Sequence, residues 1–293
     1  MAINRRGFLK TLGVAGISLT VGKSFGAARE EKNAVEFNGI LYDSTLCSGC
    51  QSCEYACSDK YELPYPTDAP VPGVVRTTSD KQRVAVNAYN TSKGPQHIRK
   101  ACNHCNEPAC ASACLTKAML KTDEGPVIWR EEKCMGCRSC MISCPFDIPK
   151  FEFDSPNPKI QKCRMCYEEL MKGDVPACVE VCPQEALTFG KRKDLIELAR
   201  TRIYAEPEKY NHNIYGEHEV GGTGLLYLAS VPFEELGLRK DLGTTSYPEY
   251  NKTFLYSVPA VLILWPAFLL GLHNSFKERR SNILKGKEDG HEE

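Results

Sequence analysis

The stretch Cys134–Pro145 reads CMGCRSCMISCP and places four cysteines within eleven residues. The chain has 16 cysteines, and every one belongs to one of four such runs. Run one is Cys47, Cys50, Cys53 and Cys57; run two is Cys102, Cys105, Cys110 and Cys114; run three is Cys134, Cys137, Cys140 and Cys144; run four is Cys163, Cys166, Cys178 and Cys182. The fold and the function of this chain depend on what these sulfurs hold.

Three other uses of cysteine fit the runs poorly. A disulfide framework does not explain C-x2-C-x2-C, which leaves one of three close sulfurs without a local partner. Zinc ribbons place two C-x2-C pairs well apart, and haem attachment needs a His directly after C-x-x-C, which no run has. Run three matches the [4Fe–4S] ferredoxin signature C-x2-C-x2-C-x3-C-P in full, and run one matches it up to the proline. The spacing therefore predicts iron–sulfur clusters.

Residues next to the cysteines suit this chemistry. Gly49 and Gly136 directly precede the second cysteine of their runs, where the backbone must approach the sulfurs closely. Pro145 and Pro183 follow the fourth cysteines of runs three and four. Runs one and two lack that proline, which weakens the motif without removing a ligand.

The segments between the runs predict short strands. Apolar residues alternate on both sides of Asp123-Glu-Gly125, a pattern typical of a strand, a turn and a second strand. The segment Glu185–Gly190 predicts another strand after run four. We therefore expect runs two and three to form one ferredoxin module, with runs one and four on either side of it in the sequence, as an internal repeat.

With these four runs in this order, the chain resembles the four-cluster ferredoxin subunits of membrane-bound respiratory oxidoreductases, from about Leu41 to the C-terminus. The resemblance implies an α+β fold with two interleaved bacterial-ferredoxin-like modules of the βαββαβ type, an extension and one C-terminal transmembrane helix. It also implies four [4Fe–4S] clusters, since all sixteen ligand positions are Cys.

The same resemblance implies a nested pairing of the runs, in which the fourth cysteine of each run serves the cluster of another. We number the four implied groups of thiols as sets. Set one is Cys47, Cys50, Cys53 and Cys182; set two is Cys163, Cys166, Cys178 and Cys57; set three is Cys102, Cys105, Cys110 and Cys144; set four is Cys134, Cys137, Cys140 and Cys114.

The N-terminus predicts export. Adjacent Arg5 and Arg6 precede Phe-Leu-Lys10 and an uncharged stretch of twelve residues, too short to span a bilayer. They resemble a twin-arginine signal, which exports proteins already folded around their cofactors, although Asn4 stands where Ser or Thr is usual. The alternative is an ordinary basic signal region. The residues up to 28 contain no clear A-x-A cleavage motif. The sequence therefore leaves open whether the signal segment is removed.

The C-terminal part predicts a membrane anchor. Phe254–Leu272 has no charge over 19 residues, about 28 Å as a helix, which is close to the thickness of the hydrocarbon core. A buried core helix is the alternative. More Lys and Arg follow the segment than precede it, which predicts a cytoplasmic tail and a periplasmic cluster domain. The expected divisions are a signal segment (1–28), a double ferredoxin-like domain (36–200), a partner-docking extension (201–249), a transmembrane helix (250–274) and a tail (275–293).

The function that this organisation predicts is electron transfer in the inner membrane. Lys plus Arg and Asp plus Glu both number 37, so no basic surplus indicates nucleic acid. No residue pattern indicates catalysis by this chain alone. The resemblance implies a periplasmic catalytic partner and a multi-span, quinone-reactive membrane subunit. A [NiFe] hydrogenase of the hydrogenase-2 type, with its small and large subunits, is the partner favoured. The catalytic subunit of a formate dehydrogenase is the alternative, and a sensing or structural protein is a third possibility.

Four cations lie beside cluster cysteines in the sequence: Arg99, Lys100, Arg138 and Arg164. Each either raises the reduction potential of a cluster or is a solvated surface charge. The sequence does not separate the two. His104, inside run two, is expected to support the ligands or to lie at the surface, because four cysteines already complete a cluster.

Overall fold

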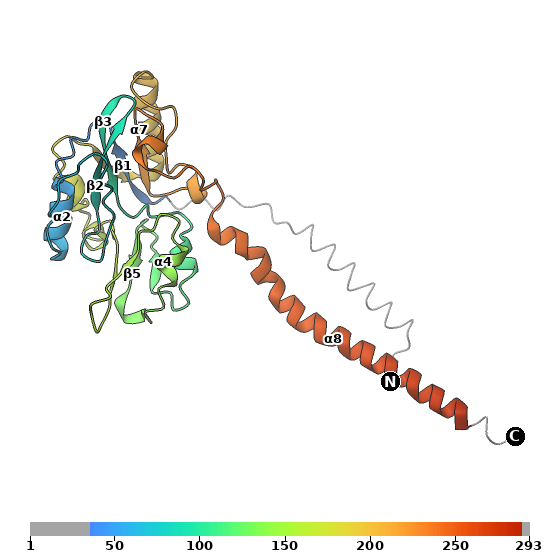
Figure 1. Ribbon diagram of the computed structural model, residues 1–293. Helices are drawn as coiled ribbons and strands as arrows, with labels where there is room; N and C mark the ends of the chain where they lie inside the picture. Colours follow the sequence, from blue (N-terminus) through green and yellow to red (C-terminus); the bar gives the residue numbers. More distant parts are fainter. Residues whose placement is uncertain (1–35, 289–293) are drawn as a thin grey trace. The chain divides into compact units, whose positions relative to one another are not determined.

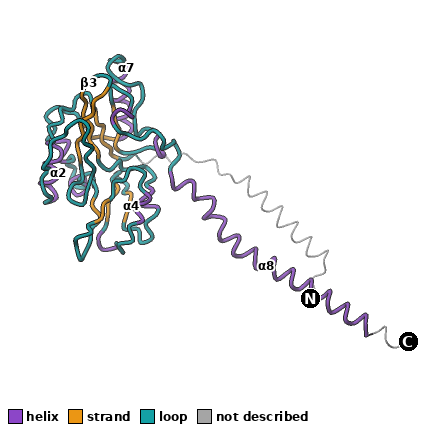
Figure 2. The backbone as a smooth tube through the Cα atoms, in the orientation of Figure 1, coloured by secondary structure: helices purple, strands orange, loops and turns teal. Residues whose placement is uncertain are grey.

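The computed structural model describes residues 36–288, so the expected signal segment with Arg5 and Arg6 lies outside the described residues. Residues Glu36–Tyr250 form one compact unit, in which loops and turns connect short helices and strands (Figures 1 and 2). Its strands are β1 (Asn38–Asp43), β2 (Ala85–Thr91), β3 (Gly94–Lys100), β4 (Met119–Lys121), β5 (Val127–Trp129), β6 (Lys150–Phe151), β7 (Ile160–Gln161), β8 (Leu187–Lys191) and β9 (Leu225–Leu228).

The helices of this unit are mostly a single turn. They are α2 (Ser52–Tyr61), α3 (Ala109–Ser112), α4 (Ser139–Ser143), α5 (Tyr167–Leu170), α6 (Ala177–Glu180) and α7 (Arg192–Ala205), with 3-10 turns η2 (Glu131–Lys133), η3 (Glu219–Gly221) and η4 (Phe233–Leu236). Short helices alternate with short strands along the chain, in agreement with the α+β class expected from the sequence.

Strand β1 is the centre of a three-stranded sheet with the order β8-β1-β9. It pairs antiparallel with β8 and parallel with β9. β1 directly precedes run one and β8 directly follows run four, so this pair joins the two outer runs. The strand predicted after run four is therefore confirmed, and its partner is the strand before run one.

The inner runs are joined in the same way by the hairpin β4–β5, which confirms the predicted strand, turn and strand. Gly125 occupies the turn with φ of 121°, a conformation that glycine adopts without strain. The tip of this hairpin contacts β1, since the N–H of Asn38 donates to the carbonyl of Glu124 at 2.7 Å. Two further hairpins, β2–β3 and β6–β7, connect the runs.

The helices that carry the cysteines pack in corresponding pairs. α2 of run one packs against α6 of run four, and α3 of run two packs against α4 of run three. Strand pairs and helix pairs thus join the same runs: one with four, and two with three.

The segment expected as a separate extension is part of this domain. Leu225–Leu228 form β9, and their side chains are at most 2% exposed. Helix α7 packs on β1 and β9, where Leu195 and Ala199 join Leu226 in one apolar cluster. The structure therefore differs from the expected domain boundary at residue 200, because the third strand of the central sheet comes after it.

Helix α8 (Tyr247–Glu288) contains the expected membrane segment. By length and composition, Tyr247–Ser281 is one candidate transmembrane helix, with a mean hydropathy of 2.0 in its most apolar window. Large apolar side chains such as Leu262 and Trp265 are exposed along it. Pro259 and Pro266 lie inside the helix, and the helical conformation continues beyond residue 274.

Gly125, in the turn between β4 and β5, tests how closely this hairpin packs against β1, and Gly94 is its control. A Cβ at Gly125 would lie 2.4 Å from the carbonyl oxygen of Asn38, whereas a Cβ at Gly94, also at positive φ, would meet nothing within 4 Å. We expect Gly125→Ala to destabilise the protein by roughly 2–4 kcal/mol, from backbone strain plus overpacking. Gly94→Ala carries the strain alone, about 1–2 kcal/mol. The measurement is the unfolding midpoint of both full-length variants, and equal shifts would contradict the prediction.

Candidate metal centres

None of the sixteen cysteines forms a disulfide bond in the described structure. Two of the four sets line small cavities. Set one lines a cavity that Tyr42, Val86 and Leu187 also line, and set four lines a second cavity beside Met119, Trp129 and Ile160. In each cavity three thiols come from one run and the fourth comes from its partner run.

The thiols of sets two and three are also neighbours of one another. Burial raises the pKa of Cys57, and the nearby Cys163 and Cys178 raise it further. In set three, burial raises the pKa of Cys105 well above its usual range, and so do Cys102, Cys110 and Cys144. The structure therefore brings the members of each set close together, and their role as cluster ligands stays a prediction.

The four sets follow one another in a row. Cys178 of set two raises the pKa of Cys53 in set one, so these two sets are adjacent. Cys163 of set two and Cys102 of set three both act on the buried hydroxyl of Tyr227. Cys140 of set four raises the pKa of Cys110 in set three. The order along the row is one, two, three, four.

The residue before the second cysteine has a left-handed backbone in every run. Its φ is 74° at Gly49, 47° at His104, 70° at Gly136 and 55° at Met165. This conformation turns backbone N–H groups toward sulfur: Gly49 donates to Cys47 Sγ and Met165 donates to Cys163 Sγ, both at 3.4 Å. N–H donors to sulfur favour the charged thiolate. The two glycines indicated this geometry in the sequence, but His104 and Met165 did not.

A second repeated feature is the turn after the fourth cysteine. In runs two, three and four, the N–H three residues later donates to the carbonyl of that cysteine at 3.1–3.2 Å. The donors are Lys117, Asp147 and Glu185, all at positive φ. Because run two makes this turn without a proline, the missing proline does not change the local structure there.

The buried thiols need more than protein dipoles to ionise. Burial raises the pKa of Cys110 and of Cys53 to about 12, and burial raises that of Cys178 to about 11 even though Arg99 lowers it. Iron ligation requires the deprotonated form. Bound iron would supply the positive charge that brings these thiols to the thiolate form, so a metal centre fits the sets.

Two buried cations also agree with anionic metal centres at the thiol sets. Arg99 and Lys162 are only 2% and 1% exposed, and within residues 36–288 neither forms an ion pair with a carboxylate. Arg99 Nη2 lies 3.5 Å from Cys178 Sγ, and Lys162 Nζ lies 3.7 Å from Cys102 Sγ. A buried charge is costly unless it is compensated, and anionic thiolate clusters would compensate both. The sequence indicated Arg99 but not Lys162.

The other three cations singled out from the sequence are placed differently. Arg164 is partly exposed and pairs with Glu168 at 2.6 Å. Arg138 lies over the rings of Phe151 and Phe153, at 5.2 and 5.5 Å from their centroids. Burial lowers the pKa of Lys100, whose neighbours include Asp147. Of the four, only Arg99 is buried against a cluster cysteine.

His104 is buried rather than at the surface, with 1% of its area exposed. Its Nδ1 accepts a hydrogen bond from the N–H of Val127 at 2.9 Å, which ties run two to β5. Burial lowers its pKa well below the usual value, and the cations Lys162, Lys121 and Arg99 lower it further. His104 is therefore a neutral supporting residue.

Within the described chain, no three His, Cys, Asp or Glu side chains are close enough together to hold a single metal ion. A [4Fe–4S] cluster makes a different demand, because each of its irons takes its own thiolate. Sulfurs arranged around a cage do not have to meet at one point.

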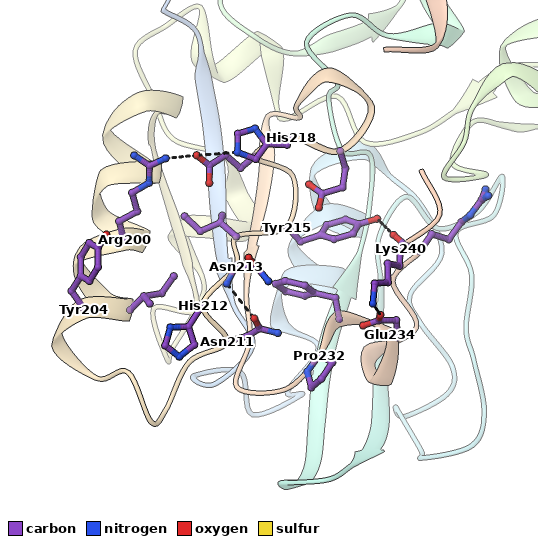
Figure 3. Close-up of a pocket in the computed structure, with 16 residues that line it drawn as sticks. Arg200, Tyr204, Asn211, His212, Asn213, Tyr215, His218, Pro232, Glu234 and Lys240 are labelled. Carbon is purple, nitrogen blue, oxygen red and sulfur yellow. Dashed lines mark hydrogen bonds and ion pairs between the residues drawn. The ribbon is translucent and has the colours of Figure 1, made fainter. Parts of the chain in front are cut away.

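A larger hollow lies elsewhere on the domain. It is a groove of about 690 Å³ lined by residues 200–240, and no cysteine lines it. Figure 3 shows Arg200 and Tyr204 on one side of the groove, and Glu234 and Lys240 on the other. Glu234 pairs with Lys240 at 2.9 Å, and Arg200 pairs with Glu217. Its charges are thus partly neutralised within the protein, and the groove belongs to the segment for which docking was expected.

Comparison with known proteins supports an iron–sulfur assignment. Residues 95–192 match the family model described as the 4Fe-4S dicluster domain. The hydrogenase-2 operon protein HybA of Escherichia coli O157:H7 is 32% identical, over 99% of this chain and 100% of its own length. The nitrate-inducible formate dehydrogenase iron–sulfur subunit of E. coli K12 is 33% identical, over 69% and 72%. A protein of Nitratidesulfovibrio vulgaris is 42% identical, over 94% and 78%.

Gly49 and Gly136 offer a matched test of run geometry, because both precede a second cysteine at positive φ. A Cβ at Gly49 would lie 2.4 Å from the ring of His97, whereas the nearest atom to a Cβ at Gly136 is 4.0 Å away. We expect Gly49→Ala to lose about four iron atoms per chain, the content of one cluster. Gly136→Ala retains its iron. Iron analysis of anaerobically purified protein measures both, and equal losses would contradict this reading of His97.

Proposed function

This chain belongs to the family of iron–sulfur electron-transfer subunits with a 4Fe-4S dicluster domain, and we propose that it relays electrons through four [4Fe–4S] clusters. In this proposal the relay connects a periplasmic catalytic module to a quinone-reactive subunit in the membrane. The catalytic module is a [NiFe] hydrogenase. The alternative is a role as the beta subunit of a formate dehydrogenase or another molybdopterin oxidoreductase.

The observation that carries the proposal is the row of four adjacent thiol sets, all of them free cysteines. Each bound cluster would supply a carrier that accepts and releases one electron. The chain's own residues would hold these carriers in order: the paired runs provide the thiolates, the left-handed turns direct N–H groups at sulfur, and Arg99 and Lys162 offset negative charge. No residue of the chain is assigned a catalytic role.

Membrane attachment in this proposal is through α8, which is long and apolar enough to cross a bilayer. The excess of Lys and Arg after the apolar segment supports a cytoplasmic C-terminus. Arg5 and Arg6 support export of the folded domain. The two signals are independent, and both support a periplasmic position for the clusters, next to the proposed partner subunits.

The choice of hydrogenase over formate dehydrogenase is supported by coverage. Similarity to the hydrogenase-2 operon protein extends over 99% of this chain, whereas similarity to the formate dehydrogenase subunit covers 69%. The export signal also favours hydrogenase, since beta subunits of formate dehydrogenases resemble this chain in the anchor but usually rely on the signal of their catalytic partner.

The cluster number and the nested pairing have a direct test. Anaerobically purified protein should contain roughly sixteen iron atoms per chain. Cys182→Ala should remove the centre that Cys47 helps to hold and leave the centre of Cys163 intact, while Cys57→Ala should do the reverse. Electron paramagnetic resonance of the reduced variants measures which signal is lost. Iron near eight atoms in the unmodified protein, or loss of the same signal in both variants, would contradict the proposal.

The partner is tested by purification from native membranes. We expect this chain to be isolated with a large subunit that contains nickel, together with a multi-span membrane protein. Metal analysis and mass spectrometry of the complex identify both. Molybdenum or tungsten in place of nickel would replace the hydrogenase with the formate dehydrogenase alternative.

A further inference from the structure

The position of the two buried cations is specific within the row of thiol sets. Arg99 Nη2 contacts Cys178 of set two at 3.5 Å, and Arg99 also lines the cavity of set one. Lys162 Nζ donates to the carbonyl of Cys163, of set two, at 2.9 Å and lies 3.7 Å from Cys102 Sγ of set three. Arg99 therefore contacts set two and borders set one, whereas the sulfur that Lys162 approaches belongs to set three.

Other groups add positive charge or hydrogen-bond donors at set two. Arg83 acts on Cys57, whose pKa it lowers against the raising effects of burial, Cys163 and Cys178. The buried hydroxyl of Tyr61 lies near Cys166 and lowers its pKa, while burial raises it. The guanidinium of Arg83 lies over the ring of Tyr61 at 3.9 Å from its centroid. Set two thus has Arg83 and the Tyr61 hydroxyl beside it in addition to Arg99.

The surroundings of set four are different. Cys137 of this set is exposed, and Arg138 lines the cavity of set four but lies over two aromatic rings. Water screens charges at such an exposed position. Buried charges are screened far less, so the same cation acts more strongly at set two than at set four.

We propose that Arg99 raises the reduction potential of the centre at set two, so that this centre accepts an electron before the exposed centre at set four. This inference rests on the proposed electron relay. When an electron passes between neighbouring centres, one is oxidised and the next reduced by one electron. The extra negative charge on the reduced centre is favoured by fixed positive charge beside it. An electron in transit would therefore favour set two over set four.

Two variants and one matched control test the proposal. Arg99→Gln removes the charge, and Arg99→Lys keeps the charge while changing the geometry. Arg164→Gln is the control, because Arg164 also neighbours a cysteine of set two in the sequence but is partly exposed and paired with Glu168. The measurement is a potentiometric titration of the purified, full-length iron-loaded protein followed by electron paramagnetic resonance, with the signal of set two assigned by its loss in Cys57→Ala.

We expect Arg99→Gln to lower the ratio of reduced to oxidised set-two centre about tenfold at a given potential, which is about 59 mV for a one-electron couple. Arg99→Lys should recover most of this shift, and Arg164→Gln should leave the potential nearly unchanged. A purely structural role for Arg99 predicts no recovery by Lys. An unchanged potential in Arg99→Gln protein that retains its iron, or an equal shift in Arg164→Gln, would overturn the proposal.

The unmodified protein provides a second measurement that does not depend on the folding of any variant. As the potential is lowered, the signal of set two should appear before the signal of set four. Reduction of set four before set two would overturn the inference. If the iron content is near sixteen atoms per chain but set four is reduced before set two, only this inference fails and the proposed electron relay stands. An iron content near eight atoms per chain would overturn the relay itself.

Discussion

The pairing of segments far apart in the sequence is the constraint on which the domain depends. Cys182 completes the group of thiols begun by Cys47, and this brings the start and the end of the cysteine-rich region together. Pairing of β1 with β8 and packing of α2 on α6 hold the same two regions in place. The inner runs repeat this arrangement with β4, β5, α3 and α4. Secondary structure can be short and loops can be long, because the sites and the strand pairs stabilise the same contacts.

The second requirement is that the buried thiols can carry negative charge in an interior without water. Thiols in this domain are buried beside other thiols, and burial alone keeps several of them protonated. Backbone N–H groups, Arg99 and Lys162 all counteract this effect, and each reaches sulfur because a local turn or a strand places it there. Arg99 comes from β3, and Lys162 directly follows β7. The hairpins between the runs therefore deliver charge to the sites in addition to connecting them.

Much of this architecture could be predicted because it depends on spacing that is local in the sequence. The four runs, the β4–β5 hairpin, the strand after run four and the glycine turns before Cys50 and Cys137 all follow from short patterns. The features that were missed depend on tertiary packing. Nothing in the sequence distinguishes Lys162 from a surface lysine. It is buried only in the folded domain, where its ammonium donates to the carbonyls of Val127 and Cys163. The left-handed turns at His104 and Met165 have no glycine to indicate them, and β9 joins the sheet only because β1 has a free edge.

The nested arrangement also fixes an order of synthesis. A ribosome that has translated run one has made three of the thiols that line the first cavity, but the fourth, Cys182, follows 129 residues after Cys53. The two inner sets, three and four, have all of their thiols once Cys144 has been made. Assembly factors that meet the nascent chain therefore encounter complete inner sites while the outer ones are still open. Loss of the last part of run four would leave the earliest cysteines of the chain without their partner.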